Sequence, residues 1–207
     1  MKKRDVSYEV IRVIAMIFIL VLHEINTFMN KGTILYYVLA TILLTGVPLF
    51  FMLSGKYAFN IDYNDKDYIE KYYKNKFINL IIPVLVYMAI KEFHVMGYNL
   101  HKEITTYSYI RALFVSIFNG YSYMEYWYLY ILIANLLLAP FIGKWIIQAN
   151  KKEATIFLSV IMVVNTISTC LGYIDLSFAV KYALASYGIY FYGGYFLDKF
   201  YNSKKEK

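Results

Sequence analysis

Long apolar stretches alternate with short charged segments along the chain of 207 residues. A helix needs about 20 mainly apolar residues to cross a bilayer, and six stretches meet this requirement. We therefore expect an all-α, polytopic transmembrane helix bundle that forms a single domain over residues 1–207. The predicted spans are Tyr8–Phe28, Thr33–Phe59, Phe77–Tyr98, Trp127–Ile147, Ala154–Ile174 and Ser177–Phe200.

Three shorter features modify this pattern. The stretch Ile104–Phe118 is short and carries Arg111, so it predicts an interfacial helix that does not span. Residues 60–76 alternate acids and lysines, which is typical of a solvated, amphipathic segment leading into the third span. Gly46 and Pro48 lie inside the second span, where a proline is expected to bend the helix.

Composition supports a membrane protein and sets its orientation. Sixty per cent of the residues are hydrophobic and only 17% are charged. A soluble domain of this length would need more polar residues to cover its surface. The net charge of +7 comes mostly from lysines in loops and tails, so nucleic-acid binding is not expected. A cytoplasmic N-terminus places the larger share of these charges inside. An even number of spans then makes the C-terminus cytoplasmic as well.

The start of the chain and its few metal-ligating residues exclude other classes. Residues 1–4 and the apolar run after them resemble a signal peptide, but no small-residue cleavage site follows, so we expect an uncleaved first span. Cys170 is the sole cysteine, so no internal disulfide is possible. The three histidines are not at ligand spacing, and no metal is expected.

One face of the first predicted span carries polar side chains. Arg12 lies about one turn inside this span, and His23 follows it within the same span. Steps of about 100° bring the two side chains to within roughly 20° of one direction, about 16 Å apart along the axis. Such a stripe must face protein or a water-filled cavity. The other polar residues near this face are Tyr8, Glu9, Asn26 and Thr27.

The stripe has a functional and a structural interpretation. Ionisable groups inside a membrane are functional by default, and histidine titrates near neutrality, which suits a general base. Glu9 is expected to pair with Arg12 and to ease its burial. In the structural interpretation, Arg12 reaches lipid phosphates at the cytoplasmic surface and His23 lies in the outer interface. The residues alone leave both open.

Four stretches together resemble the acyltransferase-3 family of membrane proteins, which O-acylate cell-surface sugars and related acceptors. The first is Glu9-x-x-Arg12 with His23 after it, since the family has an acidic residue, an arginine and a histidine at this spacing. The second is the string Gly-Val-Pro-Leu-Phe-Phe-Met-Leu-Ser-Gly at residues 46–55, which is similar to the family's second-span motif. The others are Trp-Tyr-Leu-Tyr at 127–130, running on to a proline at 140, and residues 188–197.

The resemblance implies a bacterial plasma-membrane acyltransferase. Its donor is expected to be cytoplasmic acyl-CoA, usually acetyl-CoA, as a co-substrate without any bound cofactor. Its acceptor is expected to be a hydroxyl of a cell-surface glycan or a lipid-linked sugar. By this match His23 is the catalytic base, with Glu9 in the same catalytic group, and Arg12 helps to hold the donor.

The remaining site residues follow from the third and fourth spans. Lys74 and Lys76 are expected to contact the donor, because the family often has two arginines just before the proline that opens its third span. Lys76 matches one of them, and Asn79 stands where the second is expected. Lysine binds phosphate as a point charge, so donor contact here is expected to be weaker. The residues assigned to the acceptor are Lys91, Glu92, Glu125 and Trp127.

Two alternatives remain open from the sequence. The first is a transporter or permease in which Arg12 and His23 line the path. The second is an inactive, truncated homologue or a partner subunit, because the family usually has about ten spans and this chain has six predicted ones. The chain is therefore expected to be incomplete relative to the family, with another subunit as a candidate source of further spans. Beyond that, the expected partners are membrane lipid, acyl-CoA and the acceptor.

Overall fold

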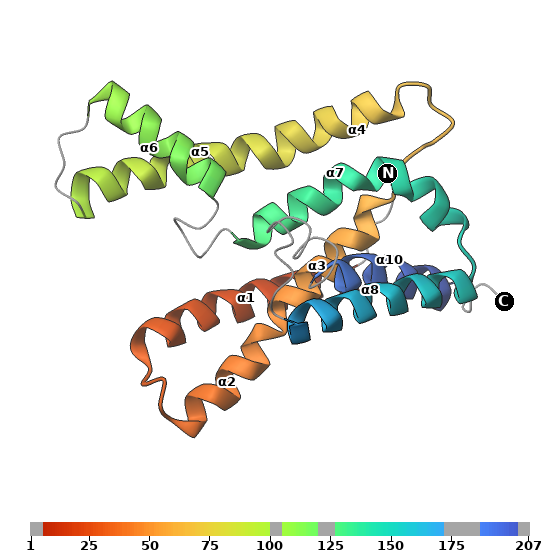
Figure 1. Cartoon of the computed structure of the whole chain (residues 1–207), viewed down its shortest axis with the longest axis horizontal. Helices are drawn as coiled ribbons and strands as arrows, with labels where there is room; N and C mark the ends of the chain where they lie inside the picture. The colour runs from red at the N-terminus through yellow and green to blue at the C-terminus, as the bar shows by residue number, and fades with distance from the viewer. Residues whose placement is uncertain (1–5, 100–104, 120–126, 172–186, 203–207) are drawn as a thin grey trace. The chain divides into compact units, whose positions relative to one another are not determined.

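The computed structural model describes residues 6–99, 105–119, 127–171 and 187–202, and the regular elements in these ranges are all helices (Figure 1). The predicted all-α class is confirmed. The helices are α1 (Val6–Phe28), α2 (Ile34–Leu44), α3 (Gly46–Ala58), α4 (Tyr68–Lys76), η1 (Phe77–Ile81), α5 (Ile82–His94), η2 (Val95–Asn99), α6 (Thr106–Asn119), α7 (Trp127–Gln148), α8 (Lys151–Leu171) and α10 (Gly188–Asn202).

Four stretches of the described residues are long and apolar enough to cross a membrane. They correspond to the first four predicted spans, although the third begins nine residues earlier than Phe77. The fifth and sixth predicted spans are not among these four. Helix α8 covers residues 154–171 of the fifth, and α10 covers residues 188–200 of the sixth, while parts of both predicted spans lie outside the described residues. The four are Val6–Phe28, Ile34–Ala58, Tyr68–Gly97 and Trp127–Gln148.

The chain divides into two compact units. Unit 1 consists of Met1–Asn60 together with Ile131–Lys207, and unit 2 consists of Ile61–Tyr130. Unit 1 therefore contains α1, α2, α3, α8, α10 and nearly all of α7, whereas unit 2 contains α4, η1, α5, η2 and α6.

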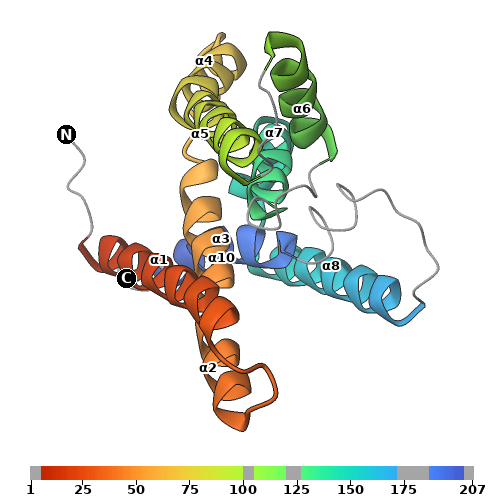
Figure 2. The ribbon, with the colours of Figure 1, turned by 90° about the vertical axis from the view of Figure 1, so that its left-hand side faces the viewer.

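Glycines allow three helices of unit 1 to approach each other closely. A Cβ atom added at Gly55 would overlap the backbone of Phe191, and one added at Gly194 would overlap the backbone of Met52. The backbones of α3 and α10 are therefore in direct contact where these helices cross, which Figure 2 shows. Small residues at crossing points permit such packing between membrane helices.

Gly46 has the same role between α3 and α1. A Cβ atom added there would lie 2.8 Å from the carbonyl oxygen of Ala15 and 2.9 Å from Cβ of Phe18. Ala15 is fully buried at this contact, whereas Val13 and Ile14 beside it are exposed. The face of α1 that packs on α3 is thus centred near Ala15.

The predicted bend in the second span appears as a short break. Helix α2 ends at Leu44, and α3 begins at Gly46. Pro48 has no N–H for the carbonyl of Leu44, so the helical ladder is interrupted there. The Thr45 hydroxyl donates to the carbonyl of Ile42 at 2.6 Å and helps to end α2.

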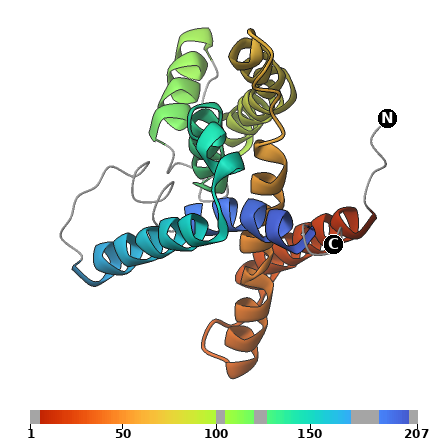
Figure 3. The same cartoon turned by 90° about the vertical axis from the view of Figure 1, so that its right-hand side faces the viewer.

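Helices α7, α8 and α10 meet at the other side of unit 1, where Figure 3 shows α8 beside α10. The rings of Phe157 in α8 and Tyr192 in α10 lie 5.3 Å apart, nearly perpendicular. The Lys199 ammonium donates to the carbonyls of Ile147 and Ala149, at 2.7 and 2.6 Å. This lysine therefore satisfies carbonyls at the end of α7 that no helical N–H can reach.

Unit 2 is built around one continuous helical rod from Tyr68 to Gly97. The predicted solvated lead-in, residues 60–76, ends in α4, which has no fully buried residue and is continuous with the rest of this helix. Thirty residues span roughly 45 Å, more than a hydrocarbon core of about 30 Å, so the lysine-rich first turns extend beyond the core. Pro83 follows the π-helical segment η1, as expected where a missing N–H shifts the hydrogen-bond register.

Candidate functional site

The predicted polar stripe of α1 borders the face that packs on α3. Arg12 lies about 60° and His23 about 80° around the helix from Ala15, the centre of that face. Neither residue is on the opposite side of the helix. Arg12 is half-buried and His23 is exposed. The stripe therefore runs along the edge of a helix–helix contact.

Glu9 and Arg12 form the ion pair that their spacing predicts. Nη1 of Arg12 donates to both carboxylate oxygens of Glu9, at 2.8 and 3.1 Å. Their side chains remain 39% and 41% exposed, so this pair is accessible from outside the described chain. Both hydrogen bonds come from Nη1, and the fork formed by the other guanidinium nitrogens has a geometry that suits a phosphate.

Helix α3 brings a second cation close to Arg12. The Arg12 guanidinium carbon lies 5.8 Å from the centre of the Tyr57 ring, and the Lys56 ammonium lies 5.6 Å from the same centre. Cations at this distance are attracted by the ring face. Tyr57 thus joins the two cations at the end of unit 1 where α1 begins and α3 ends.

Lys56 is also part of a three-residue cluster, defined by Tyr8, Lys56 and Asp198. The Lys56 ammonium donates to Oδ1 of Asp198 at 2.8 Å, and the Tyr8 hydroxyl donates to the same oxygen at 2.5 Å. The ammonium also lies over the Tyr8 ring. The cluster connects the start of α1 with the ends of α3 and α10.

Lys56 and Asp198 were not among the site residues predicted from the sequence. Both lie near the ends of predicted spans, Thr33–Phe59 and Ser177–Phe200, and they carry opposite charges. The rule that ionisable residues in a span seek partners could have identified them as a candidate pair. Their contact joins residues 142 positions apart, which no local pattern reveals.

The far end of the stripe holds His23. Its backbone carbonyl accepts a hydrogen bond from the Thr27 hydroxyl at 3.1 Å, while no described side chain hydrogen-bonds its imidazole. Asn26 is held differently, because its Oδ1 accepts from the Tyr36 hydroxyl at 2.7 Å. That bond ties α1 to α2 and leaves the exposed His23 ring available.

Comparison with models of known protein families identifies the family of this chain. The model of the family named acyltransferase 3, described as an acyltransferase domain, matches residues 5–207. The chain belongs to the acyltransferase-3 family. The searches of curated proteins and of solved structures each returned no match.

The acyltransferase-3 assignment confirms the family that the four motifs suggested. The chain is therefore a member of a family of membrane acyltransferases. The motif residues Glu9, Arg12 and His23 all lie within the matched range, as do the glycines at 46 and 55. In the structure these glycines form helix contacts with α1 and α10. The second-span motif of this acyltransferase-3 chain therefore supports α1 and its polar stripe.

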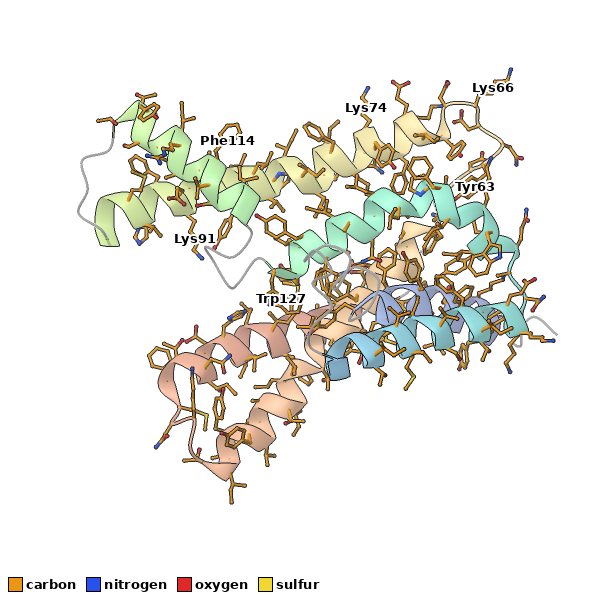
Figure 4. All side chains as sticks on the ribbon, in the orientation of Figure 1. Tyr63, Lys66, Lys74, Lys91, Phe114 and Trp127 are labelled. Carbon is orange, nitrogen blue, oxygen red and sulfur yellow. The ribbon has the colours of Figure 1, made fainter. Side chains whose placement is uncertain are left out.

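The two lysines assigned to the donor do not converge. Lys74 and Lys76 are two residues apart on a helix, so their directions differ by about 160°. Figure 4 shows Lys74 and Lys66 extending from unit 2, whereas the Lys76 ammonium lies 5.3 Å from the centre of the Tyr72 ring. Both lysines belong to unit 2, and Arg12 belongs to unit 1.

The segment before α4 is fixed by a local ion pair. The Lys71 ammonium donates to Oδ2 of Asp65 at 2.5 Å, and this bond lowers the pKa of the Asp65 carboxyl below its ordinary value. The alternation of acids and lysines noted in residues 60–76 thus pairs charges within the segment. It leaves Lys74 exposed.

The acceptor residues have different surroundings. Glu92 is 5% exposed and accepts a hydrogen bond from the Ser116 hydroxyl of α6 at 2.7 Å, so it joins two helices. Lys91 is half-buried, and the Trp127 ring lies 6.4 Å from that of Tyr128. Figure 4 labels Lys91 on α5 and Trp127 at the start of α7. Glu125 lies outside the described residues.

Unit 2 also contains an apolar groove of about 560 Å³ between α5 and α6. Of the predicted acceptor residues that the structure describes, none lines this groove. Among the described residues, no three His, Cys, Asp or Glu side chains gather as they would around a metal ion. The groove is lined by Val86, Ala89, Ile90, Phe93, Thr106 and Tyr109.

Proposed function

We propose that this chain transfers an acyl group, in the first instance acetyl, from cytoplasmic acyl-CoA to a hydroxyl of a cell-surface glycan or lipid-linked sugar. The family assignment supports acyl transfer. The half-exposed guanidinium of Arg12 supports an anionic donor at the start of α1. The protein acts in a bacterial plasma membrane, with both termini in the cytoplasm.

The proposed chemistry needs one base. His23 removes the proton from the acceptor hydroxyl as the oxygen attacks the thioester carbonyl carbon. The carbon–sulfur bond then breaks, CoA leaves as the thiolate, and it takes up a proton to give the free thiol. The products are an ester and CoA. Glu9 holds Arg12 in the orientation in which its remaining donors meet phosphate.

Distance along α1 sets a condition on the donor. Arg12 and His23 are about 16 Å apart along the helix axis. A donor whose phosphates lie at Arg12 must therefore extend along the stripe before its thioester reaches His23. A long, narrow arm between the charged part and the reactive part of the donor satisfies this condition.

We also propose that another transmembrane element covers the stripe, from a second subunit or a further segment. The half-exposed Glu9–Arg12 pair and the exposed His23 support this proposal, because charged groups facing lipid are costly. If a partner is needed, CoA release is expected in membranes from the native host and not from the isolated chain. Equal release from both would exclude the need for a partner.

The test of the activity is acetyl-CoA-dependent release of free CoA by membranes that contain the chain. The His23→Ala variant is expected to lose this release while still inserting into the membrane. The His94→Ala variant is the matched control, because His94 is a second exposed histidine on a different helix. Release that persists in His23→Ala would exclude His23 as the base.

A further inference from the structure

A pocket of about 300 Å³ lies among α1, α3 and α10, directly beside the Tyr8–Lys56–Asp198 cluster. Its walls are mostly apolar, and the polar cluster occupies one end. On the side of α10, Leu197 and Tyr201 are 61% and 62% exposed. The apolar and glycine residues that complete the lining are Ile11, Leu49, Met52, Leu53 and Gly194.

This pocket does not lead to the proposed base. Its lining on α1 ends at Ile11, and one turn further along α1 the backbone of Ala15 is in close contact with Gly46. That contact closes the space between α1 and α3 well before the level of His23. An acyl donor in the pocket would therefore stop short of the base, so the pocket is a separate site.

Its shape and position fit one chain of a membrane phospholipid. A volume of about 300 Å³ is at the lower end of the range for small-molecule sites. The cluster lies where α1 begins and where α3 ends, and both belong to candidate spans. That level corresponds to lipid headgroups, and the apolar walls extend from it towards the hydrocarbon core.

The charges at the polar end select among headgroups. The charged side chains that line the pocket, Lys56 and Asp198, form an ion pair and sum to zero net charge. A zwitterionic headgroup keeps this balance, whereas an anionic one adds an unmatched charge beside a partly buried ion pair. The lysine can donate to a phosphodiester, and a carboxylate accepts hydrogen bonds from a primary ammonium.

We propose that this pocket binds a zwitterionic phospholipid with a primary ammonium headgroup, of the phosphatidylethanolamine type. One acyl chain lies against Leu49, Leu53 and Leu197. The phosphodiester lies at Lys56, and the headgroup ammonium lies at Asp198. The bound lipid then fills the space between the three helices next to the cluster.

The experiment measures lipid binding to the purified full-length chain by native mass spectrometry. Phosphatidylethanolamine, phosphatidylcholine and phosphatidylglycerol with matched acyl chains are titrated separately. Phosphatidylcholine has the same charge as phosphatidylethanolamine but no N–H donor, and phosphatidylglycerol is anionic. Phosphatidylethanolamine is expected to bind about tenfold more tightly than either, the size of one charge-assisted hydrogen bond.

Two variants localise the binding. Leu197→Trp fills the pocket from its exposed side and is expected to weaken phosphatidylethanolamine binding at least about tenfold. Leu35→Trp is the matched control, because Leu35 is 60% exposed on α2 and does not line the pocket. Asp198→Asn removes the carboxylate that accepts from the headgroup ammonium and is expected to abolish the preference for phosphatidylethanolamine over phosphatidylcholine. Equal or tighter binding of phosphatidylglycerol, or unchanged binding in Leu197→Trp, would overturn the proposal.

Discussion

Two adjacent glycines of α10 provide the sharpest test of how α3 and α10 pack. A Cβ atom added at Gly194 would overlap the backbone of Met52, whereas one added at Gly193 would meet no atom of the described residues within 4 Å beyond its own helix. Both residues are helical, so alanine gains about 1 kcal/mol of helix propensity at either position. That gain cancels when Gly193→Ala and Gly194→Ala are compared.

The remaining difference is the cost of separating two helices. Overpacking a tight contact costs about 1–3 kcal/mol, and the cost should reach the upper end because backbone, not a flexible side chain, is displaced. For a chain of this size, such a cost corresponds to a melting temperature roughly 2–12 °C lower for Gly194→Ala than for Gly193→Ala.

Thermal unfolding of the full chain in detergent, followed by tryptophan fluorescence, measures this difference. Gly55→Ala, which affects the same helix crossing from α3, is expected to resemble Gly194→Ala. If Gly194→Ala and Gly193→Ala melt together, the close crossing of α3 and α10 is wrong.

The remaining predictions concern charged groups. Arg12→Ala is expected to raise the KM for acetyl-CoA about tenfold or more, and Arg12→Lys less, because lysine keeps the charge without the fork; an unchanged KM would contradict the donor role. Lys199→Met leaves carbonyls at the end of α7 without their donor and should cost about 1–3 kcal/mol of stability, measured by thermal unfolding against exposed Lys152→Met as control. The pKa of Asp65 is lowered by Lys71 in the folded chain, so its stabilising contribution is present above the ordinary carboxyl pKa and is lost as pH falls through the lowered value. Helix content of residues 68–76, followed by pH titration, should show this change, and Asp65→Asn should remove it.

The apolar pattern predicted the first and fourth spans closely. Tyr8–Phe28 and Trp127–Ile147 differ by at most two residues at each end from α1 and α7. These segments are long and uninterrupted, so burial in lipid and local helix propensity agree. The apolar pattern placed the start of the third span at Phe77, whereas the helix itself begins at Tyr68, because residues 68–76 are polar. They are helical as the continuation of an apolar helix that propagates outward from its core.

Half of the candidate site was predictable from α1 alone. The Glu9–Arg12 pair depends on spacing within one helix, so periodicity was sufficient. Lys56 and Asp198 required knowledge of which helix ends meet, and that depends on the close approach allowed by Gly55 and Gly194. A sequence read one helix at a time contains no signal for that approach.

Helix α1 packs on α3 with one face and carries the polar stripe on the neighbouring face. Mutations on the two faces are therefore expected to have different effects. Side chains around Ala15 meet α3, where extra volume must displace the backbone near Gly46. Arg12 and His23 lie 60–80° away, where the described chain leaves space. Changes on the first face should reduce folding and with it every function. Changes on the second face should leave the fold intact, so a loss of activity there reports on the chemistry of the stripe itself.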